Sequence, residues 1–501
     1  MSAVPATNAA APERVLTREI LAPAAVVVLG ALMTILDATI VNVALPTLGR
    51  DFGTSISTIQ WVPTIYLLAF AGIIPLTGWA SERFGAKRVW LASLGAFMLG
   101  SLLCGLAWSI GALIAFRVVQ GLGGGMIIPL GQTILARAAG PDRMGRVMSI
   151  VGVPMLLAPI FGPVVGGAII GSASWRWIFF VNLPVGAVAL LLAVKLLPAV
   201  PPWPHERLDT LGLVLLSGGI AAFLYGLARS TAADAAAWAA LGCGLALVAL
   251  FVRHALRSPN PLLDVRLFAQ RGFATATATN FVLGVALFGV ALLLPLYFQI
   301  VRGRSPLETG LLLVPQGLGA AVAMPLAGSL TDRIGARRVV PTGVVVALAG
   351  VAAYARIGAH SPYWYLAAAL FAVGVGLGST ITPSMAVAYQ SLERRAVPQA
   401  TSALNTVQRI AGSLGTALLA VALQRAMRSE LPGFHGGLAE ATALAARDPA
   451  RVTPALAHAF GTTFWVALAL TAAALVPALL LPGLRETDSR GGTNAPPDHS
   501  D

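Results

Sequence analysis

Long apolar segments separated by short polar ones run along this 501-residue chain. A helix needs about 20 mostly apolar residues to cross a bilayer, and this pattern predicts fourteen spanning helices. They cover residues 21–45, 59–80, 89–107, 110–136, 147–171, 177–197, 210–228, 236–254, 273–298, 310–330, 339–357, 363–389, 403–424 and 462–481. We therefore expect an all-α polytopic membrane protein.

An internal repeat divides these segments. Residues 75–89 (PLTGWASERFGAKRV) and 325–339 (PLAGSLTDRIGARRV) are identical at eight of fifteen positions. Each copy follows an even-numbered segment, so we expect both loops on one side of the membrane. The chain then divides into two six-helix bundles at 21–197 and 273–481, with two inserted helices at 210–254. Paired bundles of this kind are typical of transporters.

The composition fits a lipid bilayer environment, because 57% of residues are hydrophobic and only 11% are charged, against roughly a quarter in soluble domains. The net charge of +13 is spread in twos and threes between apolar segments, which argues against a nucleic-acid partner. With the N-terminus inside, 21 of the 33 Lys and Arg residues lie on the inner side. The positive-inside rule then places both termini in the cytoplasm.

The polar ends of the chain complete the predicted organisation. Residues 1–20 have no signal-peptide pattern and are expected to form a cytoplasmic tail, while residues 482–501 are polar and expected to be disordered. A long outer loop is expected at 425–461. Cys104 and Cys243 lie in apolar segments, and the six histidines lie in loops, tails or helix ends. We therefore expect no metal site and no cofactor.

Four motifs resemble those of the major facilitator superfamily. The repeated loops are similar to its loop motif, with Glu82 where the family usually carries Asp. Residues 36–46 (LDATIVNVALP), 117–125 (RVVQGLGGG) and 159–167 (PIFGPVVGG) resemble the first-, fourth- and fifth-helix motifs of its fourteen-helix drug:proton antiporters. The resemblance, to the QacA/EmrB-like branch, covers nearly the whole chain. It implies the major facilitator fold with two inserted helices.

Asp37 is the only acidic residue well inside a predicted span. A charge in the bilayer interior costs several kcal/mol and is usually functional. Asp37 lies about 13 Å from Pro46 at the outer helix end, and Arg117 about 10 Å from the outer start of the fourth helix, so the two share a layer. They form either a structural ion pair or a proton-coupling site. The resemblance implies the second role.

Several polar and aromatic residues within spans are candidates for lining a substrate cavity. Each class also has an equally good structural explanation. The amides could form hydrogen bonds between helices, and Arg409 could snorkel toward the membrane surface. The aromatic residues could belong to the interfacial belt. The candidates are Asn42, Trp61, Tyr66, Gln120, Asn280, Gln316, Asn405 and Arg409.

The loops and the fifth helix have implied mechanical roles. In the resembling family, the repeated loops act as cytoplasmic latches, although topology alone would also explain their basic residues. The implied latch residues are Gly78, Glu82, Arg83, Gly85, Arg88, Gly328, Asp332, Arg333, Gly335 and Arg338. The fifth helix seals the interface between the halves in that family, and the residues implied here are Pro159, Gly162, Pro163, Gly166 and Gly167.

The sequence thus favours a proton-driven antiporter that exports lipophilic or monocationic small molecules across a bacterial plasma membrane and works as a monomer. A dedicated exporter of a self-made antibiotic, a lipid or a metabolite is the alternative on the same fold. A membrane-embedded enzyme would need paired acids, a histidine cluster or an activated nucleophile within the spans, and none is seen. The absence of a GxxxxGK[ST] loop argues against ATP-driven export.

Overall fold

The computed structural model describes residues 18–139, 144–199, 207–229, 235–390, 392–393, 395–431, 440, 444 and 447–483. Within these ranges the chain forms helices and connecting turns, without a strand. The predicted N-terminal tail up to residue 17, most of the tail 482–501 and much of the predicted loop 425–461 lie outside the described residues.

Helices occupy each of the fourteen predicted positions. In the N-terminal half they are α1 (Arg18–Asp51), α2 (Ile56–Ile59), α3 (Trp61–Ile73), α4 (Leu76–Phe84), α5 (Ala86–Gly105), α6 (Ile110–Ala139), α7 (Met144–Ser172), α8 (Trp177–Phe180) and α9 (Asn182–Leu196). The inserted pair is α10 (Thr210–Ala228) and α11 (Ala235–Arg257).

The C-terminal half repeats the alternation of long helices and short turns. Its elements are η3 (Val265–Ala269), α12 (Arg271–Leu296), the π-helical turn η4 (Tyr297–Val301), α13 (Pro306–Ile334), α14 (Ala336–Tyr354), α15 (Tyr363–Gln390), α16 (Val397–Glu430), α18 (Pro449–Ala473) and α19 (Leu475–Leu479). Both α16 and α18 extend into the predicted outer loop 425–461.

Twelve helical segments of the described part are long and apolar enough to cross a membrane, and thirteen if the bent pair α3 and α4 counts as one span. Outside that count, the 29-residue α7 occupies the fifth predicted position. The predicted span 59–80 is bent, because α3 and α4 meet at 56°. Pro75 lies at this break as the residue before α4, and proline lacks the backbone donor that a continuous helix needs.

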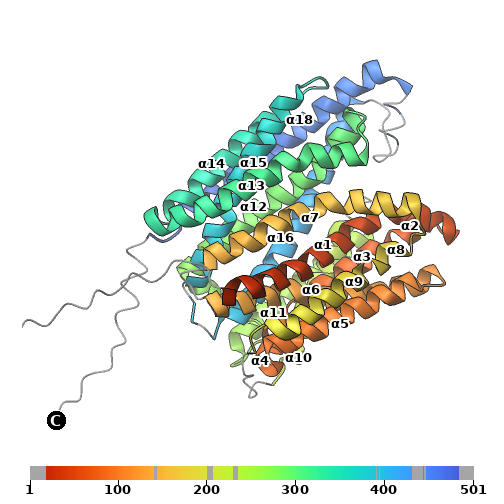
Figure 1. Ribbon diagram of the computed structural model, residues 1–501. Coiled ribbons are helices and arrows are strands. Elements are labelled where there is room, and N and C mark those ends of the chain that lie inside the picture. The colour runs from red at the N-terminus through yellow and green to blue at the C-terminus, as the bar shows by residue number, and fades with distance from the viewer. Residues whose placement is uncertain are drawn as a thin grey trace, which may run out of the picture.

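The two halves form two groups of helices that meet through α7 and α16. In Figure 1, α13, α14, α15 and α18 lie above, and α1, α3, α5, α6 and α9 lie below, with α7 and α16 between them. Helix α7 packs on α13 and α15, whereas α16 packs on α4 and α6. Each half therefore contributes one helix to the surface of the other.

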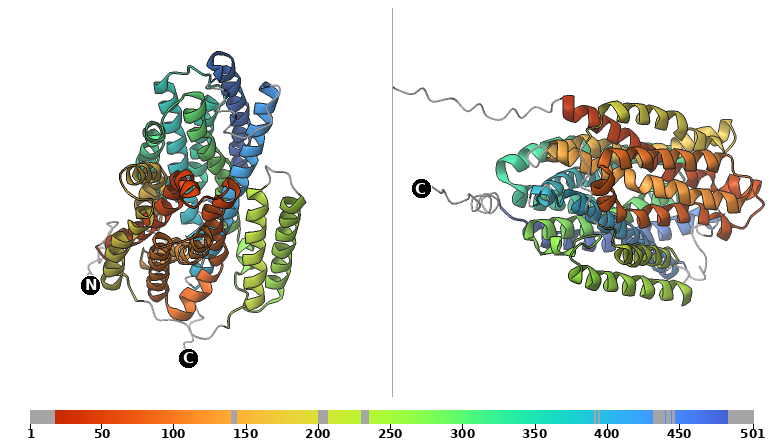
Figure 2. Two further views of the ribbon diagram at one scale, coloured as in Figure 1. Left: turned by 90° about the vertical axis from the view of Figure 1, so that its right-hand side faces the viewer. Right: turned by 90° about the horizontal axis from the view of Figure 1, so that it is seen from below.

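The inserted helices α10 and α11 pack on each other along one flank of the molecule (Figure 2). Helix α10 also contacts α3 of the first half and α16 of the second. Asp209 precedes α10 and joins the pair to the next segment: its Oδ1 accepts a hydrogen bond from Gly212 N at 2.8 Å and lies 2.8 Å from His254 Nε2, while its Oδ2 accepts one from Leu262 N at 3.1 Å.

The two repeated loops have the same backbone geometry. Gly85 separates α4 from α5 with φ 87° and ψ 131°, and Gly335 separates α13 from α14 with φ 81° and ψ 151°. Side chains other than glycine strongly disfavour this region, so glycine at these matched positions fixes the same turn in each half. We call the end of the molecule with these two turns the loop end, which lies to the left in Figure 1.

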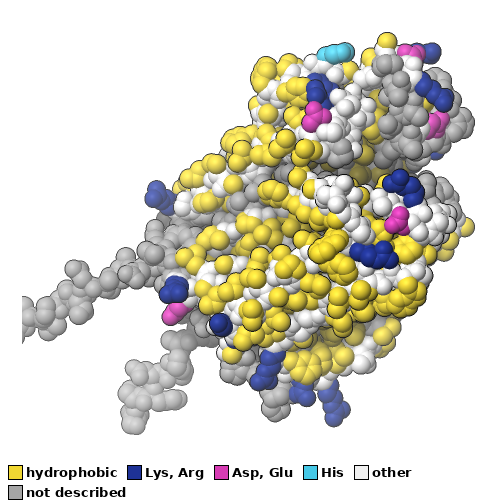
Figure 3. Space-filling view, turned by 45° about the vertical axis from the view of Figure 1, so that its right-hand side comes forward, with side chains coloured by type: hydrophobic (Ala, Val, Ile, Leu, Met, Phe, Trp, Pro, Cys, Tyr) yellow, Lys and Arg dark blue, Asp and Glu magenta, His cyan; other side chains and the backbone are white. Residues whose placement is uncertain are grey.

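The outer surface is suited to lipid. Hydrophobic side chains cover the broad middle of the face in Figure 3, and charged side chains gather mainly toward its ends. The same view shows a notch between the upper and lower lobes, on the side away from the grey tails. The two lobes are thus separated by a notch at the end opposite the loop end.

Candidate functional site

Asp37 and Arg117 form a buried ion pair within the N-terminal half. Helix α1 supplies Asp37 and α6 supplies Arg117, and Arg117 Nη1 donates to Asp37 Oδ2 at 2.6 Å. Both side chains are fully buried, with 0% exposure. The shared layer predicted from helix rise therefore corresponds to a direct contact. Such a pair is stable only if its remaining polar atoms find partners.

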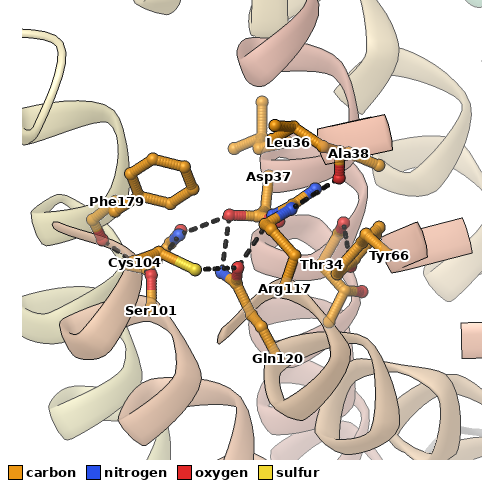
Figure 4. A network of polar contacts seen from close by, with 12 residues as sticks. Thr34, Leu36, Asp37, Ala38, Tyr66, Ser101, Cys104, Arg117, Gln120 and Phe179 are labelled. Atoms are coloured by element: carbon orange, nitrogen blue, oxygen red, sulfur yellow. Dashed lines mark hydrogen bonds and ion pairs between the residues drawn. The ribbon is translucent and has the colours of Figure 1, made fainter. Parts of the chain in front are cut away.

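Amide side chains provide those partners (Figure 4). Gln120 Nε2 donates to Asp37 Oδ1 at 2.8 Å, and Asn182 Nδ2 donates to the same oxygen at 2.9 Å. Arg117 Nη1 also donates to Gln120 Oε1 at 2.7 Å, and Asn182 donates to Ser101 Oγ at 3.0 Å. Helices α1, α6 and α9 thus meet at one carboxylate, and α5 joins the network through Ser101. Hydrogen bonds to an ionised group stabilise that form.

The rest of the Arg117 guanidinium lies among aromatic and backbone groups. Its Nε donates to Val62 O at 3.3 Å, and its Cζ lies 4.0 Å from the centre of the Tyr66 ring and 5.8 Å from that of Phe179. Tyr66 is itself held by a hydrogen bond from its hydroxyl to Thr34 O at 3.3 Å. Arg117 Nη2 is buried with no hydrogen-bond partner among the described residues. The Arg117 guanidinium therefore has contacts on several sides, but within the described part of the chain one of its nitrogens lacks a hydrogen-bond acceptor.

Glycines in α5 and α6 allow the backbone approach that assembles this network. A Cβ on Gly121 would lie 2.6 Å from Tyr66 O, closer than a real contact allows. A Cβ on Gly100 of α5 would lie 2.6 Å from Gln120 Cα. Glycine at these two positions lets the backbones of α3 and α5 pack directly on α6 near the ion pair.

A stripe of polar residues on α16 contacts the N-terminal half. Ser402 Oγ donates to Ile74 O at 2.7 Å, and Asn405 Nδ2 donates to Gln132 Oε1 at 2.7 Å. Arg409 Cζ lies 4.3 Å from the centre of the Phe70 ring. Residues three and four apart share one face of a helix, so this single face joins the halves at two hydrogen bonds and one cation–π contact.

Two of the cavity candidates lie near the end opposite the loop end. Asn42 is exposed on α1 and donates to Ala38 O at 3.4 Å. Trp61 stacks on Tyr225 of the inserted helix α10, with ring centres 5.7 Å apart. The aromatic surface of Trp61 is therefore engaged by α10 in this structure.

Two further candidates lie in the C-terminal half. Asn280 on α12 is half-buried, and its Nδ2 has no hydrogen-bond partner among the described residues. Gln316 on α13 is also half-buried. Its backbone carbonyl oxygen packs against Gly374 of α15, and a Cβ on Gly374 would overlap that oxygen. Neither is joined to the Asp37 network by any hydrogen bond in the described part of the chain.

The first repeated loop lies against the beginning of α16. A Cβ on Gly78 would lie 3.3 Å from Gln399 Cα, so the two backbones approach closely at the loop end. Glu82 is half-buried and Gly85 buried, whereas Arg83 and Arg88 are exposed.

In the second loop, Gly328 and Gly335 are buried, and Arg333 and Arg338 are exposed. The side chain of Asp332 lies outside the described residues. The close approach at Gly78 therefore joins the first repeated loop to the opposite half.

The glycines of α7 divide between two environments. A Cβ on Gly162 would overlap Thr39 Oγ1 of α1, and one on Gly166 would lie 2.8 Å from Ile40 Cγ1. Gly167 is exposed, with no atom within 4 Å of the position of a Cβ. Helix α7 therefore packs on α1 through Gly162 and Gly166. The side chains of Pro159 and Pro163 are outside the described part.

Four residues that complete these contacts were not predicted from the sequence: Ser101 and Asn182 in the Asp37 network, and Gln132 and Ser402 between the halves. Asn182 and Gln132 are single amides within apolar stretches, which was the available signal. Among the described residues, no group of three or more His, Cys, Asp and Glu could hold a metal ion.

The chain is similar to known membrane transporters over most of its length. It is 42% identical over 486 residues to a multidrug resistance protein B homolog of Mycobacterium tuberculosis, covering 92% of this chain and 90% of that one. It is 33% identical over 402 residues to the multidrug export protein EmrB of Haemophilus influenzae, covering 78% of each. The solved proton:xylose symporter XylE superposes with a TM-score of 0.62 at 14% identity, covering 94% of this chain and 98% of that one, which shows the shared fold.

The family assignment follows from these similarities and from the architecture. The model of the Major Facilitator Superfamily matches residues 27–416, a range that contains the ion pair, the first repeated loop and most of the second half. Members of this superfamily are transporters rather than enzymes. The protein belongs to the major facilitator superfamily, among its multidrug efflux transporters.

Proposed function

We propose that this protein is a proton-coupled antiporter that exports lipophilic or monocationic small molecules by alternating access. We place it as a monomer in a bacterial plasma membrane, with the loop end and both chain termini in the cytoplasm. The observation that carries the proposal is the buried network around Asp37, the one acidic side chain in the middle of a span.

The network gives the two protonation states of Asp37 different structural preferences. When ionised, Asp37 accepts hydrogen bonds from Arg117, Gln120 and Asn182 and balances the charge of Arg117. When protonated, it no longer balances that charge. A proton can bias a conformational equilibrium only by binding the two conformations with different affinity, and the hydrogen bonds to the ionised carboxylate support such a difference.

Contacts between the halves support alternating access. At the loop end, α16 bonds to Ile74 and Gln132, and Gly78 lies against Gln399. The opposite end shows a notch between the lobes (Figure 3). With the loop end in the cytoplasm, this arrangement corresponds to an outward-facing state. Export then requires the contacts at Ser402 and Asn405 to break and re-form once per cycle.

The number of acids limits the charge of the substrate. One carboxylate offsets one positive charge, and a second buried cation would remain uncompensated. We therefore favour neutral lipophilic compounds and monocations over rigid dications as substrates.

Reconstitution in proteoliposomes tests the proposal. A pH gradient across the membrane should drive uphill movement of a lipophilic monocationic dye in the unchanged protein, and Asp37→Asn should abolish it. Asp51→Asn is the matched control, because Asp51 ends the same helix and is exposed; this variant should transport normally. Dye accumulation by Asp37→Asn under the pH gradient alone would refute the role of Asp37.

A further inference from the structure

Arg409 is a second cation in the membrane interior, and it has no acidic partner among the residues that the structure describes. It lies 12 residues into α16, about 18 Å from the start of that helix at the usual rise. Its Cζ lies 4.3 Å from the centre of the Phe70 ring, and in the described part of the chain it forms no hydrogen bond or ion pair. A half-buried guanidinium without a counter-charge is costly, so its position calls for an explanation.

The ring that Arg409 contacts leads directly to the Asp37 network. Phe70 and Tyr66 are one turn apart on α3, with ring centres 5.8 Å apart. The Tyr66 ring in turn lies 4.0 Å from Arg117 Cζ. Two aromatic rings of α3 are therefore held between an arginine of the first half and an arginine of the second. Aromatic faces attract cations, so the two rings stabilise both guanidinium groups.

Three charged groups lie around this aromatic pair: Arg117 Cζ is 4.0 Å from the Tyr66 ring centre, Arg409 Cζ is 4.3 Å from that of Phe70, and Asp37 is paired with Arg117. Other ionisable groups on the helices packed against α16 lie mostly toward helix ends, except Tyr225, which stacks on Trp61. They are Glu82 and Arg83 on α4, Arg137 on α6, Tyr225 on α10, Arg271 on α12, and Arg451 and His458 on α18. The charge state around the aromatic pair is thus set mainly by Asp37, Arg117 and Arg409.

We propose that Arg409 makes the C-terminal half sensitive to protonation of Asp37, acting across the Tyr66–Phe70 pair as a positioning residue. This inference rests on the proposed proton coupling and names the residue through which the coupling reaches the second half.

Arg409 responds to Asp37 through electrostatic repulsion. With Asp37 ionised, Asp37, Arg117 and Arg409 together carry one net positive charge. Protonation of Asp37 raises this sum to two and leaves Arg117 and Arg409 facing each other across the two rings. Like charges repel strongly in a medium of low dielectric constant. The contact between α3 and α16 is therefore weakened when the proton binds.

Arg409 lies on the same face of α16 as the residues that join the two halves at the loop end. Asn405 lies one turn away on the same face of α16 and bonds to Gln132, and Ser402 lies a further turn away and bonds to Ile74. A force that moves Arg409 away from Phe70 acts on the same rigid helix. Proton binding at Asp37 should therefore favour opening of the loop end and closing of the opposite end.

Distances measured by pulsed EPR as a function of pH test this inference. Nitroxide labels are placed on cysteines that replace Trp108 and Trp364, which are 76% and 73% exposed, lie in different halves and lie away from the loop end. Cys243 is exposed and is replaced by Ser, while the buried Cys104 is kept. The ratio of open to closed distances should change about tenfold between pH 8 and pH 5, a usual size for such coupling.

Three variants decide whether the charge of Arg409 carries this response. Arg409→Gln should reduce the change to less than about twofold, and Phe70→Leu should reduce it partly, because the ring that holds the guanidinium is lost. Arg409→Lys keeps the charge and should retain most of the response. The matched control is Arg428→Gln, at an exposed arginine on the same helix, which should leave the response unchanged.

A full pH response in Arg409→Gln would overturn the inference. An equal loss in Arg409→Lys and Arg409→Gln would also overturn it, because packing rather than charge would then be responsible. These outcomes are distinct from failure of the proposed function, which would appear in the unchanged protein as a lack of transport driven by a pH gradient.

Discussion

Gly162 of α7 faces Thr39 of α1 with no space between them for a side chain, since a Cβ at position 162 would overlap Thr39 Oγ1. Thr39 is two residues from Asp37. The packing of α7 on α1 therefore bears directly on the helix that carries the buried acid. This contact explains in physical terms why glycine is needed at one position of the motif, and it makes a prediction that separates this position from its neighbour.

We expect Gly162→Ala to lower the free energy of unfolding by about 1–3 kcal/mol, the usual cost of forcing atoms into a packed core. Gly167→Ala is the matched control, because position 167 on the same helix is open, and it should change stability by less than about 0.5 kcal/mol. Thermal unfolding in detergent measures both. Equal melting temperatures for the two variants would contradict the close packing of α1 and α7.

Asn182 should act through Asp37. Its removal in Asn182→Ala takes away a hydrogen bond to an ionised group, which typically contributes about 1.5–3 kcal/mol. In a double-mutant cycle, the loss should shrink to less than half when Asp37 is already Asn, because the charged acceptor is gone. Thermal stability of the four proteins provides the measurement, and strictly additive losses would show that Asn182 stabilises the fold independently of Asp37.

The orientation predicts which surfaces an impermeant thiol reagent reaches in whole cells. A cysteine replacing Trp364, exposed at the end opposite the loop end, should react. One replacing Arg337, exposed at the loop end, should react only after permeabilisation. Cys243 is replaced by Ser and the buried Cys104 is retained. Reaction of the cysteine at 337 alone in intact cells would reverse the proposed topology.

Stability at acid pH should depend on Asp209. Burial raises the pKa of Asp209, but hydrogen bonds from Gly212 N, His254 and Leu262 N outweigh burial, so the pKa of Asp209 lies below its usual value of 3.8. The lowered pKa means that the ionised form stabilises the fold above about pH 4, and that this stabilisation is lost as the pH falls through the pKa of the folded protein.

We therefore expect the melting temperature in detergent to fall between pH 5 and pH 3, and to fall less steeply in Asp209→Asn. At pH 7, Asp209→Asn should lose about 1–2 kcal/mol, in the range of charged hydrogen bonds and helix caps. Asp264→Asn is the control, because Asp264 also caps a helical turn but, among the described residues, accepts a hydrogen bond only from Arg266 N, at 2.9 Å. An unchanged pH profile in Asp209→Asn would contradict the role of this contact.

The depth of a residue in the membrane could be read from the sequence. Helix rise is fixed, so counting from Pro46 and from the start of the fourth segment placed Asp37 and Arg117 in one layer, and the structure joins them at 2.6 Å. The repeated loops were likewise visible as matching letters, and Gly85 and Gly335 prove to adopt the same unusual backbone geometry.

The direction in which a membrane helix faces could not be read in the same way. Lipid-facing and core-facing sides are both apolar, so the periodicity that orients a soluble helix is weak. This is why Asn182 gave no sign of pointing to Asp37, and why the pairing of Trp61 with Tyr225 of an inserted helix was not foreseen. The break between α3 and α4 at Pro75 was missed because hydropathy alone does not register a bend.

The inserted helix α10 contacts α3 on one side and α16 on the other. Any displacement of α3 relative to α16 must therefore alter at least one of these two contacts. The stacking of Trp61 on Tyr225 ties α10 to the first half, which leaves the contact with α16 as the one that slides. In mechanical terms, a pair placed in this way would act as a brace along one flank, and we expect a stiffer flank to restrict how far the two bundles can rock.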